Sequence, residues 1–362
     1  MLKKLLLLSI LGSSLLLCVN ASAQTDFNEL YPISQHGKEG YIDRTGRIVV
    51  EPQFDIAYFF SEGIGLFATA SRKSVDGQEV KIADKWGLID SHGKIIIQPR
   101  FRSAACIFSE GLLCVGVEEG IGFVDKTGKF VIEPRFREAK DFSEGLAAIR
   151  VDDKWGYIGK NGQIIIPPQF NGANSFSEGL ALVQLGKGHL YINKAGKVVI
   201  RLAVSDAGDF HEGLARVQMV RPEEPGEPAD TKPSVGRLMI KRGKVGYIDK
   251  AGEMAISPQF DEGCDFSEGL TCVMVNDKTG YIDKTGRFVI PPRFESANDF
   301  NEGRAAITVN GLHGFIDRDG KIVIEPQFSW VSEFSRGLCH VMVDDKMGYI
   351  DKFGAYVWMP SK

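Results

Sequence analysis

The sequence has little excess charge, few cysteines and no long apolar run beyond its first residues. Its 43 Lys and Arg residues nearly balance 47 Asp and Glu residues, so the formal net charge is −4. Nucleic-acid binding requires a basic stripe or patch, and none stands out, so we predict no nucleic-acid partner. No apolar run after residue 23 approaches the ~20 residues that span a bilayer, and we expect no membrane insertion of the mature chain.

The sequence also lacks the short motifs that carry common enzyme chemistry. Its six histidines form no H-E-x-x-H pattern, and its six cysteines form no C-x-x-C pattern. A nucleophile elbow, a Walker loop and a dinucleotide-binding fingerprint are absent as well. We therefore predict that the protein is not an enzyme and has no catalytic residues, cofactor or metal. The alternative is a hydrolase whose site is assembled from lone residues of several repeats.

The N-terminal residues have the pattern of a secretory signal. Lys3 and Lys4 precede an apolar stretch from Leu5 to Val19, and residues 21–23 (Ala-Ser-Ala) fit a small-residue cleavage site. We predict that the signal peptide, residues 1–23, is removed. The mature chain is then expected in a periplasm or outside the cell.

Glycine (41 residues) and phenylalanine (23 residues) are abundant, and both recur in spaced motifs. The commonest spacing is 34 residues, as between Gly122 and Gly156. A Gly-aromatic-Ile-Asp motif, followed by a Lys-x-Gly turn, has its glycine at Gly40, Gly87, Gly122, Gly156, Gly246, Gly280, Gly314 and Gly348, with a degenerate copy at His189. A Phe-Ser-Glu-Gly-Leu motif begins at Phe60, Phe108, Phe142, Phe176, Phe210, Phe266, Phe300 and Phe334. This period predicts a tandem array of about nine units in a single repeat domain, residues 24–362.

One unit is represented by residues 146–173. Residues 146–151, 155–158 and 164–166 have the composition of three short strands, and Pro167-Pro168 ends the third, because proline cannot donate to a sheet. The third strand is apolar at consecutive positions, which indicates that both of its faces are covered. Each unit is therefore predicted to be a three-stranded meander sealed by its neighbours. We expect an all-β fold with these units stacked as an open, curved, solenoid-like array; a closed propeller-like ring is the alternative.

Two hairpins break the period at equivalent places, four units apart. The gap between the glycine of Ser-Glu-Gly and the next Gly-aromatic glycine is 24 residues from Gly63 to Gly87 and 33 from Gly213 to Gly246. We expect these enlarged hairpins, at residues 67–85 and 217–244, to project as tolerated insertions or as recognition arms. The spacing divides the array into a first block with its linker (29–205), a second block (206–337) and a terminal unit (338–362).

Four cysteines occupy the same two places in units that are four apart. Cys106 and Cys114 flank one Phe-Ser-Glu-Gly-Leu motif, and Cys264 and Cys272 flank another. Since export permits disulfides, Cys106–Cys114 and Cys264–Cys272 are candidate disulfides, with Cys339 left free. The competing explanation is that a block duplication copied two buried thiols together.

Acidic residues recur in both motifs, at the Asp before Lys-x-Gly and at the Glu of Ser-Glu-Gly. A row of cation sites is one interpretation of the Asp residues. Asp in this position is also a turn former that accepts backbone N–H groups, and Gly159 and Asn193 replace it in two units. We therefore predict turn or linker roles for both acids.

The unit resembles the WG-repeat (KWG-repeat) family. The resemblance is carried by residues 85–90 (Lys-Trp-Gly-Leu-Ile-Asp) and 154–158 (Lys-Trp-Gly-Tyr-Ile), and it extends over about residues 30–358. Tryptophan occupies only two of the nine Trp-Gly positions, so no ligand contact by this Trp is expected in every unit. The resemblance implies β-rich interaction modules and no catalytic residues.

Repetition without catalytic motifs favours a binding role. We predict an exported, non-catalytic scaffold whose partner is a protein or a cell-surface glycan. Exposed aromatic residues repeated along one face would favour a glycan, and scattered ones would favour a protein. A purely structural component of the cell envelope is the alternative.

Overall fold

The computed structural model describes residues 29–75, 78–220, 242–344 and 346–359. The predicted signal peptide and the centre of the second enlarged hairpin, residues 221–241, lie outside this range. The described residues form 35 β-strands. Among them, no helix has the length and apolarity to cross a membrane. The chain divides into a first compact unit that ends at Asp141 and a second that runs from Phe142 to Met359.

The first unit contains three antiparallel sheets in which strand order equals chain order. The sheets are β1-β2-β3, β4-β5-β6-β7 and β8-β9-β10-β11. Their bounds are β1 Tyr31–Gln35, β2 Lys38–Ile42, β3 Ile48–Phe54, β4 Ile56–Ala57, β5 Ile64–Val75, β6 Gln78–Asp90, β7 Ile95–Phe101, β8 Ser103–Ala104, β9 Leu113–Val117, β10 Gly120–Val124 and β11 Phe130–Phe136; β12 is Glu138–Ala139.

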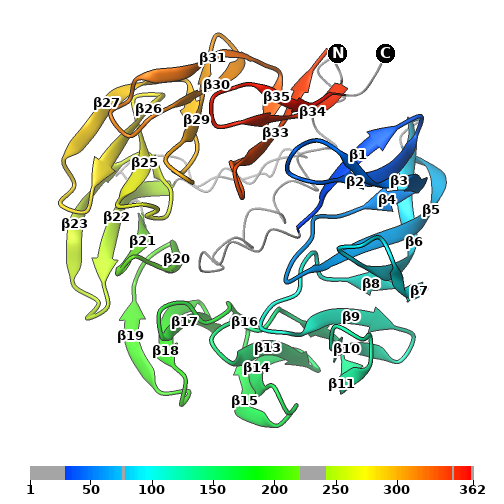
Figure 1. Cartoon of the computed structure of the whole chain (residues 1–362). Helices are drawn as coiled ribbons and strands as arrows, with labels where there is room; N and C mark the ends of the chain where they lie inside the picture. The colour runs from blue at the N-terminus through cyan, green and yellow to red at the C-terminus, as the bar shows by residue number, and fades with distance from the viewer. Residues whose placement is uncertain (1–28, 76–77, 221–241, 345, 360–362) are drawn as a thin grey trace. The chain divides into compact units, whose positions relative to one another are not determined.

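The second unit repeats this construction (Figure 1). Its strands β13, β14 and β15 pair in order, and five four-stranded sheets follow, β16–β19, β20–β23, β24–β27, β28–β31 and β32–β35. The bounds are β13 Leu146–Val151, β14 Lys154–Gly159, β15 Ile164–Phe170, β16 Gly172–Ala173, β17 Leu180–Leu185, β18 Gly188–Asn193, β19 Val198–Leu202, β20 Asp206–His211, β21 Leu214–Val220, β22 Arg242–Asp249, β23 Met254–Phe260, β24 Glu262–Gly263, β25 Leu270–Val275, β26 Lys278–Asp283, β27 Phe288–Phe294, β28 Ser296–Ala297, β29 Ala305–Val309, β30 Leu312–Ile316, β31 Ile322–Phe328, β32 Trp330–Val331, β33 Leu338–Val343, β34 Lys346–Asp351 and β35 Tyr356–Trp358.

The predicted three-stranded unit is wrong for every sheet after β1-β2-β3, because the linker supplies a fourth strand. After each Pro-x-Phe segment, a strand of usually two residues pairs with the first meander strand of the following repeat, as Gly172↔Gln184 and Ala173↔Val183 show. The Ser-Glu-Gly-Leu segment then closes a tight hairpin; Ser177 and Leu180 are bridged, and Glu178 and Gly179 both have positive φ. Two successive positive φ values match the right-handed twist of the flanking strands. The open stack of three-stranded meanders is thus replaced by four-stranded blades of the propeller type.

The core lies between neighbouring sheets. Tyr157 and Ile166 of one sheet of the second unit pack with Leu190 and Ile192 of the next, and Phe176 from the intervening linker completes the cluster. In several repeats the turn glycine sits against the third apolar residue of the preceding third strand. A Cβ added to Gly196, for example, would lie 3.1 Å from Ile166 Cγ2. Within each of the two compact units, the expectation that neighbouring repeats share their core is confirmed.

The prediction that both faces of the third strand are covered is wrong. In the second unit, only the third apolar residue of each third strand is buried. In β15, for example, Ile166 is 1% exposed, whereas Ile164 and Ile165 are 53% and 47% exposed. The same pattern occurs in β27, where Phe288 and Val289 are exposed. The third strand is the outermost strand of its sheet, so its first two residues extend beyond the region that the next sheet covers.

Candidate functional site

The exposed start of the third strand is the most repeated apolar surface of the second unit. We call it the outer-strand surface, and it comprises Ile164, Ile165, Val199, Met254, Phe288, Val289 and Tyr356, all classed as exposed. Side chains of neighbouring strand residues point to opposite faces. Both faces of an outer strand therefore present apolar groups, and Val131 of β11 has the corresponding exposure in the first unit.

Proline blocks part of the backbone of several outer strands, though not of β19 or β35, from pairing with another chain. The segment after the exposed pair reads Pro167-Pro168 in β15 and Pro291-Pro292 in β27, and proline has no N–H to donate. An irregularity in the sheet also makes this edge unsuited to pairing: the ladder between β14 and β15 shifts register between Trp155 and Tyr157. The outer-strand surface is thus suited to side-chain contacts rather than to addition of a strand.

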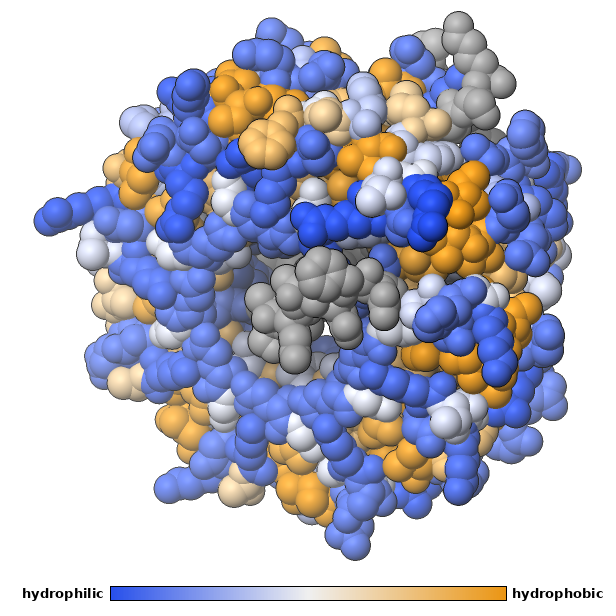
Figure 2. Space-filling view, viewed as in Figure 1, coloured by the Kyte–Doolittle hydropathy of each residue, from blue (hydrophilic) through white to orange (hydrophobic). Residues whose placement is uncertain are grey.

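Exposed aromatic residues are scattered over different positions of the repeat. Phe288 and Tyr356 start third strands, Trp330 lies in the short linker strand β32, and Phe353 lies in a turn. Figure 2 shows hydrophobic residues dispersed among hydrophilic ones on the face that it draws. The exposed aromatic residues are thus scattered, and the repeated exposed residues are mainly aliphatic.

The first enlarged hairpin is an extension of β5 and β6, which remain paired out to Val75↔Gln78. Its side chains are mostly polar, with Ser71 Oγ donating to Asp84 Oδ1 at 2.8 Å. Lys81 Nζ donates to the carbonyl oxygens of Gly37 and Asp55 at 2.7 and 3.2 Å. These bonds tie one side of the hairpin to the preceding repeat. The second hairpin's tip lies outside the described residues.

The recurring aspartates form turns. In Asp283-Lys-Thr-Gly, Oδ1 of Asp283 accepts the backbone N–H of Thr285 at 2.8 Å and of Arg287 at 3.1 Å. Asn193 makes the same two bonds with its side-chain oxygen. The bond from the Thr285 hydroxyl, together with these backbone bonds, holds the pKa of Asp283 below its ordinary value and outweighs the opposing effect of desolvation. The aspartates therefore stabilise the turn that leads into the outer strand.

The glutamates of Ser-Glu-Gly connect successive repeats. Glu178 Oε2 accepts the backbone N–H of Gly213 in the next repeat at 2.9 Å, and Lys250 Nζ lies 3.0 Å from the same oxygen. Ser177 Oγ donates to the Phe210 carbonyl at 2.6 Å. Similar Gly and Lys contacts are made by Glu62, Glu144, Glu212 and Glu302. The predicted turn role is confirmed, and these five glutamates also connect successive repeats; we call this Gly–Glu–Lys contact the Glu latch.

The structure treats the two candidate disulfides differently. Cys264 and Cys272 are joined by a disulfide, whereas Cys106 and Cys114 are free thiols. The cause lies in the linker length: Phe101 to Phe108 spans seven residues, but Phe260 to Phe266 spans six.

The extra linker residue changes which residues face each other. Ala105 N donates to Cys114 O at 2.8 Å, so Ala105 and not Cys106 lies opposite Cys114. In the second block, Cys264 N donates to Cys272 O at 2.9 Å, which places the two cysteines opposite each other. Equivalent motif positions therefore do not imply equivalent sulfur geometry. Oxidation of either pair in solution stays a prediction.

Sequence reasoning missed a row of acids directly before the Phe of the second motif. Five of its eight copies carry one, at Asp141, Asp209, Asp265, Asp299 and Glu333. Burial, with the nearby charges of Asp265 and Glu333, raises the pKa of Asp299 to about 8. Burial alone raises the pKa of Asp141 to about 6. The recurrence was visible in the sequence, but the burial of these carboxyl groups was not.

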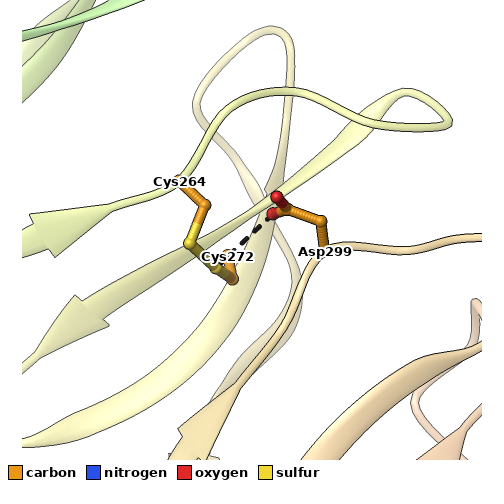
Figure 3. A group of neighbouring side chains, drawn as sticks. All are labelled: Cys264, Cys272 and Asp299. Atoms are coloured by element: carbon orange, nitrogen blue, oxygen red, sulfur yellow. Dashed lines mark hydrogen bonds between the residues drawn. A yellow bond between two sulfur atoms is a disulfide. The ribbon is translucent and has the colours of Figure 1, made fainter. Parts of the chain in front are cut away.

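One of these acids lies beside the disulfide. Cys272 Sγ is 3.7 Å from Asp299 Oδ1, and the ligand atoms of Cys264, Cys272 and Asp299 all lie within 4.8 Å of one another (Figure 3). Among the described residues, no other group of three His, Cys, Asp or Glu side chains meets this spacing. Cys272 is buried, while Cys264 and Asp299 are half-buried.

The repeat is recognised by a family model. The model of the WG-containing repeat matches residues 40–68, 86–119, 121–155, 155–188, 191–219, 246–278, 280–312 and 314–346. The chain belongs to the WG-repeat family. This finding confirms the resemblance drawn from the Trp-Gly and Phe-Ser-Glu-Gly-Leu motifs.

Similarity to one solved structure, together with the four-stranded sheets, shows that the WG repeats of this chain adopt a β-propeller fold. A chain described as "Crystal structure of the eukaryotic initiation factor" matches 91% of this chain and 95% of its own length, with 12% identity and a TM-score of 0.61. A weaker match is AztD from Citrobacter koseri, with 13% identity, coverage of 92% and 94%, and a TM-score of 0.46. The comparison with curated proteins found no match. The expected open, solenoid-like array is therefore wrong, and the propeller-like alternative describes the four-stranded sheets.

Proposed function

We propose that this WG-repeat protein is an exported, non-catalytic scaffold that binds another protein through its outer-strand surface. The supporting observation is the repeated exposure of apolar residues at the start of outer strands of the second unit, with two adjacent ones in β15 and in β27. Buried apolar area drives protein association, and exposed apolar residues gathered on one kind of element can supply it. In β15 and β27 the prolines that follow favour side-chain contacts with the partner.

Variants of the outer-strand surface test this function. Ile165, Val199 and Val289 are replaced together by Glu in the full-length mature chain. The matched control carries Leu185→Glu and Leu312→Glu, which change exposed apolar residues beside hairpin turns instead. Both variants are expected to fold, since every changed side chain is exposed. The proteins are used as bait for affinity capture from the exported fraction of their host.

The proposal predicts that wild type and control capture the same protein and that the outer-strand variant loses it. A dissociation constant measured with that purified protein is expected to weaken by at least tenfold, which corresponds to ~1.4 kcal/mol. Capture that is undiminished in the outer-strand variant would contradict the proposed surface. Binding of an isolated glycan, with no protein captured, would contradict the partner class. If the protein captures nothing, but its deletion weakens the cell envelope, the structural alternative would be supported instead.

A further inference from the structure

We propose that Cys264, Cys272 and Asp299 form a binding site for one Zn²⁺ ion when the disulfide is reduced. The three side chains come from two successive repeats: Cys264 follows β24, Cys272 lies in β25, and Asp299 precedes the hairpin before β29 (Figure 3). Their ligand atoms lie within 4.8 Å of one another. This inference is independent of the proposed protein-binding surface.

The spacing suits a zinc ion after small movements. Zinc binds thiolate sulfur at ~2.3 Å and carboxylate oxygen at ~2.0–2.2 Å in tetrahedral geometry, so two of its ligand atoms lie roughly 3.5–3.8 Å apart. The 3.7 Å between Cys272 Sγ and Asp299 Oδ1 already falls in this range. The two sulfurs must separate, which breaking the bond between them permits, and Cys264 Sγ and Asp299, within 4.8 Å of each other, must come into the same range.

The donor set selects the metal. Two thiolates favour soft or borderline cations over Mg²⁺ and Ca²⁺, while the carboxylate oxygen suits Zn²⁺ better than a purely soft ion such as Cu⁺. Three protein ligands leave a fourth position for water, which is the arrangement of an open zinc site. Half-burial of Cys264 and Asp299 leaves an entry path from solvent.

The backbone around the site is held in place without the metal. The carbonyl oxygen of Cys264 accepts hydrogen bonds from the Tyr247 hydroxyl and the Thr271 hydroxyl, each at 2.9 Å. The pairing of Cys264 N with Cys272 O keeps the two cysteines opposite each other. Reduction of the disulfide therefore leaves the ligands close together.

Site opening and metal binding are balanced chemical steps. Two equivalents of a small thiol reduce the Cys264–Cys272 bond, giving two cysteine thiols and the oxidised disulfide of the small thiol. Zn²⁺ then displaces the two thiol protons, and the Asp299 proton where one is present, and these pass to solvent. The oxidised protein offers no thiolate and cannot make the site.

The first block provides a matched control within the same chain. Cys106, Cys114 and Asp141 have the same sequence spacing as Cys264, Cys272 and Asp299: the second cysteine follows the first by 8 residues, and the aspartate follows the second cysteine by 27. The extra linker residue puts Ala105 rather than Cys106 opposite Cys114. The proposal therefore predicts one zinc site per chain and not two.

The test is metal titration of the mature, full-length protein. Reduced protein, freed of reductant under anaerobic conditions, is titrated with Zn²⁺ by calorimetry and with Cd²⁺ by the ultraviolet absorbance of cadmium–thiolate bonds. One equivalent is expected in reduced wild type and in the C106S/C114S variant. Affinity is expected to fall at least tenfold in D299N and to vanish in C264S/C272S and in oxidised wild type.

Oxidised wild type shows whether loss of binding in C264S/C272S is caused by the missing thiols or by misfolding, because the oxidised protein has the wild-type sequence and lacks only the two thiols. No metal uptake by the reduced wild type would overturn the proposal. Uptake that persists undiminished in C264S/C272S, or that disappears in C106S/C114S instead, would overturn it as well.

Discussion

At the scale of single residues, the glycine of the Gly-aromatic motif occupies a place without room for a side chain. A Cβ added to Gly156 would lie 2.5 Å from the Ile166 carbonyl oxygen and 2.6 Å from Pro168 N. The same contact with the third strand recurs at Gly40, Gly122, Gly246, Gly280 and Gly314. Glycine therefore allows the outer strand to approach the second strand where the ladder shifts register.

The substitution Gly156→Ala is expected to destabilise the protein by about 3 kcal/mol, since the obstructing atoms belong to backbone and cannot rotate away. Gly188→Ala is the matched control, because a Cβ there meets nothing closer than 3.6 Å. Urea unfolding followed by fluorescence measures both. Equal stability of the two variants would refute the close-approach explanation.

Asp141 makes stability depend on pH. Burial raises its pKa from 3.8 to about 6, and its Oδ1 has no hydrogen-bond partner among the described residues. Because the pKa is raised in the folded state, the stabilising contribution is complete below pH ~4 and is lost as pH rises through about 6.

Asp141→Asn is therefore expected to stabilise the protein at pH 7 by about 1–3 kcal/mol and to have little effect at pH 4. Asp283→Asn, in a turn whose carboxylate has a lowered pKa, should instead lose stability at pH 7. Thermal unfolding at both pH values measures these differences. A gain from Asp141→Asn of the same size at both pH values would show that its charge is not the cause.

At the scale of elements, the Glu latch connects the hairpins of successive repeats. Burial opposes ionisation of Glu178, but hydrogen bonds from Lys250 and Gly213 outweigh it and hold the pKa below 4.5. A lowered pKa in the folded state contributes stability above pH ~4.5 that is lost on acidification. The latch is thus fully formed at neutral pH.

Glu178→Ala is expected to cost about 1 kcal/mol or more, because it leaves the Gly213 N–H without its acceptor. Lys250→Ala should cost less than about 1 kcal/mol, since the lysine is largely exposed and its ion pair is screened by solvent. The two single variants and the double variant, compared by urea unfolding, give the coupling between the side chains. A larger loss from Lys250→Ala than from Glu178→Ala would contradict this order.

Sequence patterns predicted most elements but missed those that depend on contacts between repeats. The strands around Trp155 and Ile166 follow from composition and turn residues. The short strand at Gly172–Ala173 has no periodicity of its own, because its existence depends on pairing with Gln184 and Val183 of the following repeat. Burial of Ile164 was predicted wrongly, since continuous apolar character cannot distinguish a covered strand from an outer strand with an exposed end.

For the candidate sites too, the sequence predicted which residues recur but not which of them lie together. The paired recurrence of cysteines was visible in sequence, yet a single extra residue before Phe108 decided which pair lies opposite. The acids before the second-motif Phe recur clearly, but only packing reveals that Asp299 lies half-buried beside Cys272. Which side chains of neighbouring strands come close depends on the pairing register. The register is set by the length of the linkers, and a comparison of motifs alone does not consider that length.

At the scale of the whole molecule, the repeats stabilise one another. Each cluster of buried residues draws on more than one sheet, as Tyr281 and Ile290 pack with Ile307 and Ile316 of the following one. An isolated sheet would expose the half of its core that its neighbour covers. It would also lose the latch and the fixed hairpin, so we expect no sheet to fold alone.

Excision of one sheet tests this interdependence most directly. A peptide of residues 172–202 contains β16 to β19, with all of the strand pairing of one blade and none of its neighbours. At ~30 residues it is below the size at which a domain usually supports its own core. Circular dichroism should show an unfolded peptide without a cooperative thermal transition, whereas the full chain unfolds cooperatively; a cooperatively melting β-sheet in the peptide would contradict the account.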